Sequence, residues 1–116
     1  MTRRELIDYC LTYPDAYEDY PFDQVPTGST IWTALRHTGN RRTFAFVYER
    51  DGLRVNLKCE PLRADFLRQA YRGVEPAYHM NKEHWNTVVL DADVPEEELF
   101  AMIEHSYRLT LGKGRA

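Results

Sequence analysis

The chain has 116 residues, of which 43% are hydrophobic and 13% aromatic, with only six glycines and six prolines. This composition indicates one ordered globular domain and excludes disordered and collagen-like chains. The formal net charge of −3 argues against a protein that coats nucleic acid nonspecifically. No window approaches the roughly 18 apolar residues of a membrane span. We therefore expect a cytoplasmic protein with no membrane partner, a single domain over residues 1–112 and a flexible tail over 113–116.

The first element is predicted to be a helix. Thr2-Arg3-Arg4-Glu5 has the pattern of a capping box, and apolar residues follow at helical spacing until Pro14. Because proline cannot continue a helix, we expect the helix to run from about residue 3 to residue 13. Residues 15–28 contain two prolines and four acidic residues without a base. This segment is predicted to be a surface loop, of a length that often carries function.

An antiparallel meander of three strands is predicted next, over residues 31–37, 43–49 and 53–58. Thr38-Gly39-Asn40 and Asp51-Gly52 supply the turns between them. If Asp51-Gly52 is a two-residue hairpin loop, Tyr48 faces Val55 and Phe46 faces Leu57. We therefore expect four residues of this hairpin in the core beneath the first and last helices: Phe44, Phe46, Val55 and Leu57.

A second helix is predicted from Pro61, which suits a first helical turn, to a stop at Gly73. Its apolar stripe is expected to consist of Phe66, Leu67 and Ala70. A shorter hairpin over 77–80 and 85–90 should follow.

A last helix is predicted to begin at a capping-box-like pair, Asp93 and Glu96, and to run to about residue 111. Its apolar stripe consists of Leu99, Met102, Ile103, Ser106 and Tyr107. The full order is then α-β-β-β-α-β-β-α. This order predicts an α+β fold, a two-layer sandwich in which helices cover one face of an antiparallel sheet.

The chain contains no recognised catalytic motif: none of its four histidines sits in HExxH and no serine lies in GxSxG. His79 and His84 flank a predicted turn, but a metal there needs further ligands such as Cys59 or Glu83, and two polar turn histidines are the favoured interpretation. Cys10 and Cys59 form no CxxC pair and are expected to be buried thiols. We expect no enzymatic activity, no cofactor and no metal.

Charge is distributed unevenly along the chain. Six basic residues lie between residues 36 and 58, namely Arg36, Arg41, Arg42, Arg50, Arg54 and Lys58. Acidic residues gather instead in 15–23 and 91–104. In the second hairpin Lys82 and His84 precede Trp85, a residue that either stacks on a base or fills the core. Basic strand residues also guard sheet edges against strand addition.

Several short motifs together resemble the MmcQ/YjbR (DUF419-like) family of small bacterial proteins. They are Tyr20-Pro21-Phe22, Arg42-Thr43-Phe44-Ala45, Leu57-Lys58-Cys59-Glu60-Pro61, the turn from Tyr78 to Trp85, and Ser106-Tyr107. The resemblance implies the same element order, a fold similar to secretion-chaperone-like α+β sandwiches, and a "double wing" mode of DNA binding by two hairpins.

The double-wing mode places candidate nucleic-acid-binding residues on and beside the hairpins. They are Arg36, Arg41, Arg42, Lys58, Lys82, His84 and Trp85. Three functions stay open: weak DNA binding through the basic hairpins, protein interaction of chaperone type through a sheet face or edge strand, and small-molecule binding or catalysis in a pocket beside residues 20–22. Clustered cations favour the first function, a large exposed apolar patch the second, and a deep cleft the third.

Overall fold

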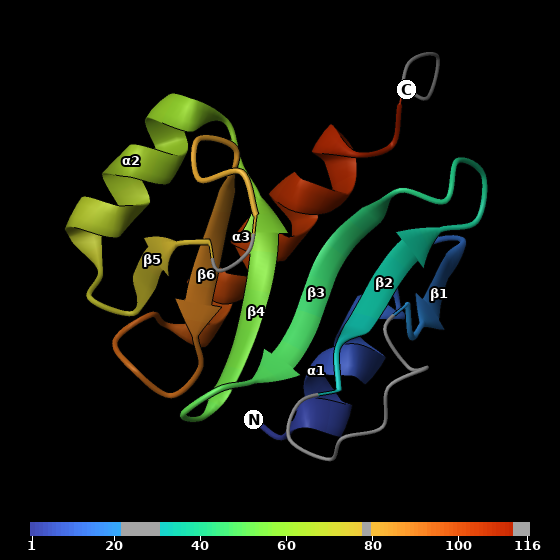
Figure 1. Ribbon diagram of the computed structural model, residues 1–116, viewed down its shortest axis with the longest axis horizontal. Helices are drawn as coiled ribbons and strands as arrows, with labels where there is room; N and C mark the ends of the chain where they lie inside the picture. Colours follow the sequence, from blue (N-terminus) through green and yellow to red (C-terminus); the bar gives the residue numbers. More distant parts are fainter. Residues whose placement is uncertain (22–30, 78–79, 113–116) are drawn as a thin grey trace.

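The computed structural model describes residues 1–21, 31–77 and 80–112 (Figure 1). Within these residues three helices and six strands form an α+β fold, as predicted. The helices are α1 (Arg3–Cys10), α2 (Pro61–Ala70) and α3 (Glu96–Leu109). The strands are β1 (Ala16–Asp19), β2 (Thr33–His37), β3 (Thr43–Glu49), β4 (Leu53–Lys58), β5 (Val74–Pro76) and β6 (Trp85–Val89). They form one antiparallel sheet in the order β1-β2-β3-β4-β6-β5.

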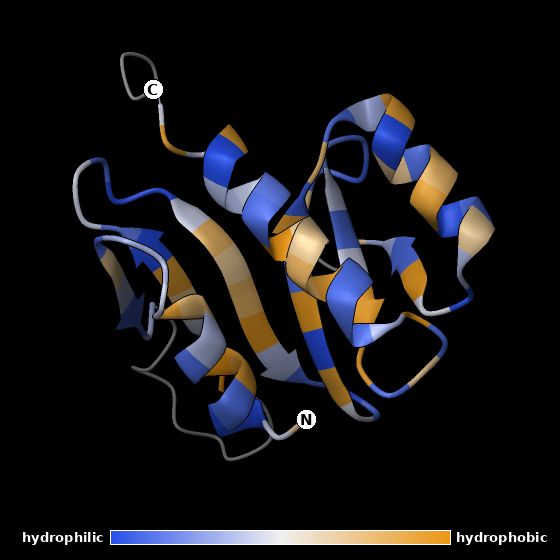
Figure 2. Ribbon diagram, turned by 180° about the vertical axis from the view of Figure 1, so that it is seen from behind, coloured by the Kyte–Doolittle hydropathy of each residue, from blue (hydrophilic) through white to orange (hydrophobic). Residues whose placement is uncertain are grey.

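The helices all lie on one face of the sheet, which Figure 2 shows from the helix side. Leu6 and Ile7 of α1 and Ile103 of α3 are buried against strand residues such as Val47 and Val55. The opposite face, toward the viewer in Figure 1, is not covered by a helix of the described chain. The main hydrophobic core of the protein therefore lies between the sheet and the helices.

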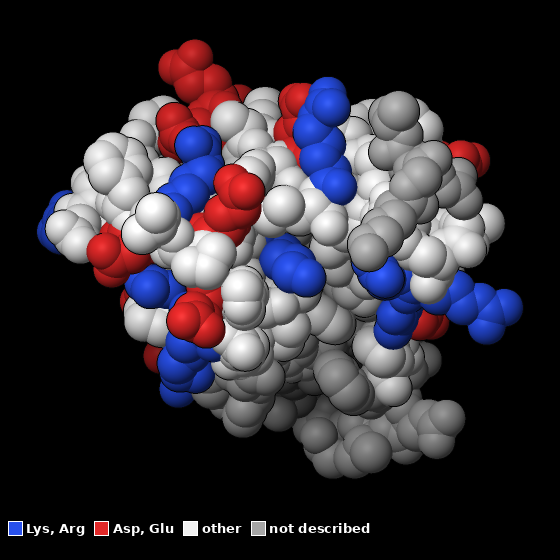
Figure 3. Space-filling view, turned by 90° about the horizontal axis from the view of Figure 1, so that it is seen from above, with Lys and Arg blue, Asp and Glu red and all other residues white. Residues whose placement is uncertain are grey.

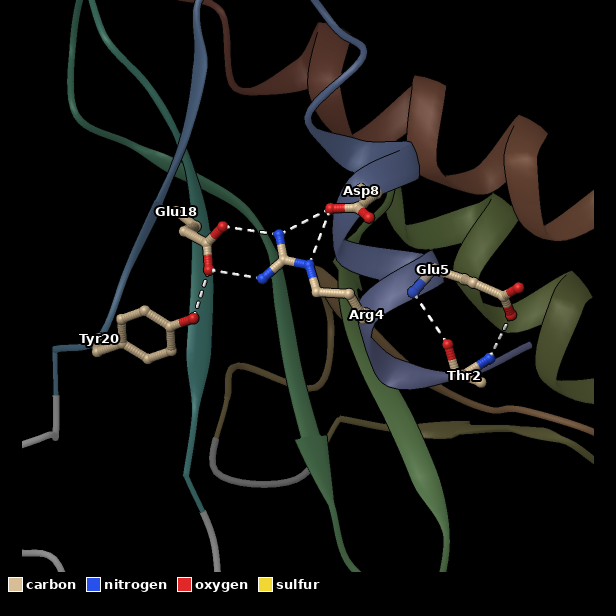
Figure 4. A network of polar contacts seen from close by, with 6 residues as sticks. All are labelled: Thr2, Arg4, Glu5, Asp8, Glu18 and Tyr20. Carbon is tan, nitrogen blue, oxygen red and sulfur yellow. Dashed lines mark hydrogen bonds and ion pairs between the residues drawn. The ribbon is translucent and has the colours of Figure 1, made fainter.

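The capping box at the start of α1 forms as predicted. Thr2 Oγ1 accepts a hydrogen bond from the Glu5 backbone N–H at 3.1 Å, and the Glu5 carboxylate accepts one from the Thr2 N–H at 2.8 Å (Figure 4). These bonds lower the pKa of Glu5. The helix ends at Cys10, earlier than predicted. The Thr12 backbone N–H donates to the Tyr9 carbonyl at 3.0 Å, three residues back, which is a turn and not a continued helix.

Residues 16–19 form the edge strand β1, so the prediction of a loop was wrong for this part. Arg4 of α1 binds Glu18 and Asp8, with 2.8 Å to each carboxylate, and the Tyr20 hydroxyl donates to Glu18 (Figure 4). The hydrogen bonds from Arg4 and, to a smaller extent, from Tyr20 lower the pKa of Glu18. The strand is therefore tied to α1 by contacts that no local pattern reveals. Residues 22–28 of the predicted loop lie outside the described residues.

The β3–β4 hairpin has the predicted strands, but its register differs by one residue. Glu49 pairs with Leu53, so the turn contains three residues rather than two. Asp51 and Gly52 both have positive φ, at 52° and 106°. Because side chains alternate along a strand, the shift moves Phe46 to the face away from the helices. The prediction that Phe46 lies in the helix-covered core was therefore wrong.

Phe44 reaches the core by a different route. The register of β3 against β2 breaks between Ala45 and Thr43, which leaves Phe44 as an extra residue. Its side chain is fully buried and belongs to the same cluster as Val55 and Leu57. The prediction for these three residues is confirmed.

The remaining corrections concern α2, β5 and the start of α3. In α2 the buried residues are Ala64 and Leu67, while Phe66 is 65% exposed, contrary to the predicted stripe. Strand β5 covers Val74–Pro76, before the predicted strand at 77–80, of which residues 78 and 79 lie outside the described residues. Asp93 does not cap α3; it accepts hydrogen bonds from the backbone N–H groups of residues 72 and 73, at 2.8 and 2.7 Å.

Candidate nucleic-acid interface at the hairpin end of the sheet

Two hairpin tips lie at the same end of the sheet, uppermost in Figure 1. Ala45 near the start of β3 pairs with Leu57 near the end of β4, and Lys58 pairs with Trp85 at the start of β6. The β2–β3 connection and the described part of the β5–β6 connection therefore lie at the same end of the sheet, with β4 between the two hairpins. We call residues 38–42, 58 and 80–84 the hairpin end.

The β2–β3 tip is held in place by Asn40. The Asn40 side-chain carbonyl accepts a hydrogen bond from the Arg42 N–H at 2.8 Å. Its amide donates to the carbonyls of Thr110 and Leu111, at 2.9 and 3.0 Å, which lie just beyond the end of α3. The main chain at Arg41 has a positive φ of 62°. The tip is thus attached to α3 while the side chains of Arg41 and Arg42 are exposed.

Most arginines away from these tips have a carboxylate partner. The ion pairs are Arg3–Glu49, Arg4–Asp8, Arg4–Glu18, Arg36–Asp19, Arg54–Glu75, Arg63–Glu98, Arg72–Asp93 and Arg108–Glu104. Arg41, Arg42 and Lys58 have none among residues 1–21, 31–77 and 80–112. Three cations without an acidic partner in the described chain therefore lie at the hairpin end.

Arg36 is one of the predicted residues with a partner. Its Nε donates to Asp19 at 2.9 Å, and its Nη1 donates to the Arg41 carbonyl at 2.9 Å. Beside it lies an open groove of about 610 Å³, lined by Tyr17, Asp19, Arg36, Thr38 and Arg41. Arg36 therefore shapes the groove, and Arg41 is the groove cation left without a carboxylate in the described chain.

At the β5–β6 tip the three predicted DNA-binding residues each contact another residue of the protein. Lys82 turns back and donates to the Ala77 carbonyl at 2.9 Å. His84 lies 3.9 Å from the Glu83 carboxylate. Trp85 does not point from the tip: it lies on the helix-free face, with its ring 6.1 Å from that of Phe46. This tip is therefore less basic than the sequence suggested.

Figure 3 looks down on the hairpin end and shows acidic side chains between many of the basic ones. The surface is therefore mixed in sign rather than uniformly positive. Such a surface favours contacts by individual cations over a broad attractive field.

Both cysteines are buried, and His105 is partly buried. Burial raises the pKa of Cys10 to about 12 and also raises the pKa of Cys59, so both remain inert thiols. His105 has a lowered pKa because burial disfavours its charged form. No three His, Cys, Asp or Glu side chains in the described residues gather as metal ligands would. Of the two turn histidines, His84 lies beside Glu83, and residue 79 lies outside the described residues.

These features define an α+β two-layer protein with a single antiparallel sheet and two hairpin tips at one end. No helix among the residues described has both the length and the apolar character needed to cross a bilayer. The chain belongs to the YjbR family, whose model matches residues 11–109. This confirms the family resemblance found in the sequence.

Relatives and solved structures are similar over nearly the whole chain. YyaQ of Bacillus subtilis is 33% identical, covering 95% of this chain and 98% of its own. YjbR of Escherichia coli is 30% identical, covering 93% and 86%. A crystal structure of a Pseudomonas syringae protein has a TM-score of 0.80 at 32% identity, covering 95% and 99%, and a Deinococcus radiodurans DUF419 protein has 0.80 at 36%, covering 99% and 82%. The names of these relatives assign no activity.

Proposed function

We propose that this protein binds duplex DNA weakly through the hairpin end, by contacts to backbone phosphates. The observation that carries the proposal is that Arg41, Arg42 and Lys58, all without carboxylate partners in the described chain, lie at the same end of the sheet. An arginine fork matches the geometry of a phosphate, and a lysine supplies a point charge.

The geometry favours backbone contacts over recognition of bases. The three helices pack on one face of the sheet, and none projects from the hairpin end as a recognition helix projects into a major groove (Figure 1). Phosphate contacts position a protein on DNA but carry no sequence information directly. The neighbouring acids limit the field, so the expected dissociation constant is on the order of 10⁻⁵ M at moderate salt.

The test is a titration of labelled duplex DNA at several salt concentrations. The double variant Arg41→Gln with Arg42→Gln removes two charges from the hairpin end. The matched control, Arg50→Gln with Arg72→Gln, removes two charges from the opposite end, where the β3–β4 turn and the start of β5 lie. With a slope of about −0.9 per phosphate contacted, losing two contacts should flatten the salt dependence by about 1.8.

The result expected is weaker binding with a flatter slope for the Arg41/Arg42 variant alone. Equal loss in both double variants would mean that net charge matters and position does not. Absence of binding by the wild type at low salt would refute the proposal. A protein-interaction role would then be favoured by the exposed Leu62 and Phe66, 89% and 65% exposed one turn apart on α2.

A further inference from the structure

The helix-free face of the sheet carries a row of aromatic side chains. Trp32 precedes β2, Phe46 lies on β3 and Trp85 begins β6. The ring centroids are 5.9 Å apart between Trp32 and Phe46, and 6.1 Å apart between Phe46 and Trp85. Phe46 and Trp85 are only partly buried. We call these three residues the aromatic row.

The same face of the sheet carries three buried residues beside the aromatic row, Tyr48, Asn56 and Thr87. The Tyr48 ring stacks on Trp32 at 4.0 Å with the planes 5° apart, and Tyr48 is fully buried. The Tyr48 hydroxyl donates to the Asn56 side-chain oxygen at 3.0 Å, and Thr87 donates to the same oxygen at 2.5 Å. Because these buried polar groups bond one another, they form a fixed network beside the aromatic row.

The charges on this face favour a polyanion. By strand register, the described strands place three cations on it, Arg36, Arg54 and Lys58, against two carboxylates, Asp19 and Glu75. Both carboxylates are held in ion pairs, by Arg36 and Arg54. Lys58 is the cross-strand partner of Trp85 and also belongs to the hairpin end. The positive excess therefore lies beside the aromatic row.

We propose that the aromatic row is a stacking surface for the unpaired bases of single-stranded nucleic acid, with Lys58 contacting the phosphate beside the base on Trp85. This inference rests on the proposed function and names a further substrate form for it. A duplex hides the faces of its bases, whereas a single strand exposes them to aromatic rings. Because every base has such a face, recognition would tolerate any sequence.

The experiment uses the tryptophan emission of the protein itself. The chain contains two tryptophans, and both belong to the aromatic row. Titration with a short single-stranded oligonucleotide should therefore quench the emission, while the matched duplex should quench it far less. Phe46→Leu and Trp85→Leu keep apolar bulk but remove a stacking ring, and Phe66→Leu on the exposed side of α2 is the matched control.

The affinities are measured by the fluorescence anisotropy of a labelled strand. Phe46→Leu and Trp85→Leu should each weaken single-strand binding about tenfold, which corresponds to about 1.4 kcal/mol. Each should weaken duplex binding less than about twofold. Phe66→Leu should change neither affinity. A chemical denaturation of each variant checks that it is folded. Duplex binding without single-strand binding, or equal single-strand affinity in the wild type and the row variants, would overturn the inference and leave the proposed function standing. Failure to bind either form overturns both.

Discussion

Replacing Ser106 by alanine should destabilise the protein strongly, although it removes one oxygen atom. The fully buried Ser106 hydroxyl of α3 donates to the Phe44 carbonyl at 2.6 Å. The same oxygen accepts a hydrogen bond from the Lys58 backbone N–H at 2.9 Å. The serine thus joins β3 at its extra residue to the last residue of β4.

The expected loss follows from the two backbone groups left behind. A buried backbone donor or acceptor that loses its partner costs about 1–3 kcal/mol. Alanine recovers up to about 0.5 kcal/mol through its higher helix propensity. Because the Lys58 bond is only partly buried, the sum for the two groups should fall in the lower part of this range, and we expect Ser106→Ala to lower the free energy of unfolding by about 2–4 kcal/mol, a large part of the stability of a domain this size.

Urea denaturation followed by circular dichroism measures this loss. With a slope of about 2 kcal/mol per molar urea, the midpoint should fall by about 1–2 M. Glu97→Ala, on the exposed side of the same helix, is the control and should leave the midpoint nearly unchanged. A loss below about 0.5 kcal/mol for Ser106→Ala would show that the two backbone groups find other partners and would refute this reasoning.

Three further predictions concern other contacts. Gly73→Ala should cost about 1–3 kcal/mol by urea denaturation, because its Cβ would come within 2.9 Å of the Ala92 Cβ and 3.0 Å of an Asp93 oxygen. The lowered pKa of His105 means that the unfolded chain binds its proton more readily, so stability should fall as pH drops below about 6.5, and less in His105→Gln. Asn40→Ala should cost about 1–2 kcal/mol and weaken DNA binding, since the β2–β3 tip loses its bonds to the end of α3.

Local patterns were enough to predict most of the elements. The capping box of Thr2 and Glu5 and the apolar stripe of α3 are contained within a few turns of helix. The bounds of β3 and β4 were likewise predicted correctly, because two runs rich in apolar residues flank a turn with Gly52. These features depend on neighbours in sequence, so a single chain is sufficient to find them.

Contacts between distant residues explain what the sequence did not predict. Strand β1 is short and acidic, and it is fixed by Arg4, a residue 14 positions before Glu18. The two-residue and three-residue turns at Asp51-Gly52 differ by one position, and both are compatible with the same sequence. Only the pairing of Glu49 with Leu53 decides between them.

The candidate site was predicted in part for the same reason. Arg41 and Arg42 were identified from their place beside a turn, and they are exposed there. The sequence could not reveal that Asp19 pairs with Arg36, or that Lys82 turns back onto its own hairpin. Finding exposed charge in a sequence is simple, but finding charge without a partner requires the fold.

The register of the β3–β4 hairpin decides whether the aromatic row forms. In the predicted register Phe46 faces the helices, and the other face has no aromatic residue between Trp32 and Trp85. In the observed register Phe46 stands between their rings, at 5.9 and 6.1 Å, and completes the aromatic row. The core has an aromatic side chain from β3 without Phe46, because the extra residue in this strand directs the side chain of Phe44 into the core. One strand thus supplies an aromatic side chain to each face: Phe44 packs in the core, and Phe46 is the central ring of the proposed stacking surface.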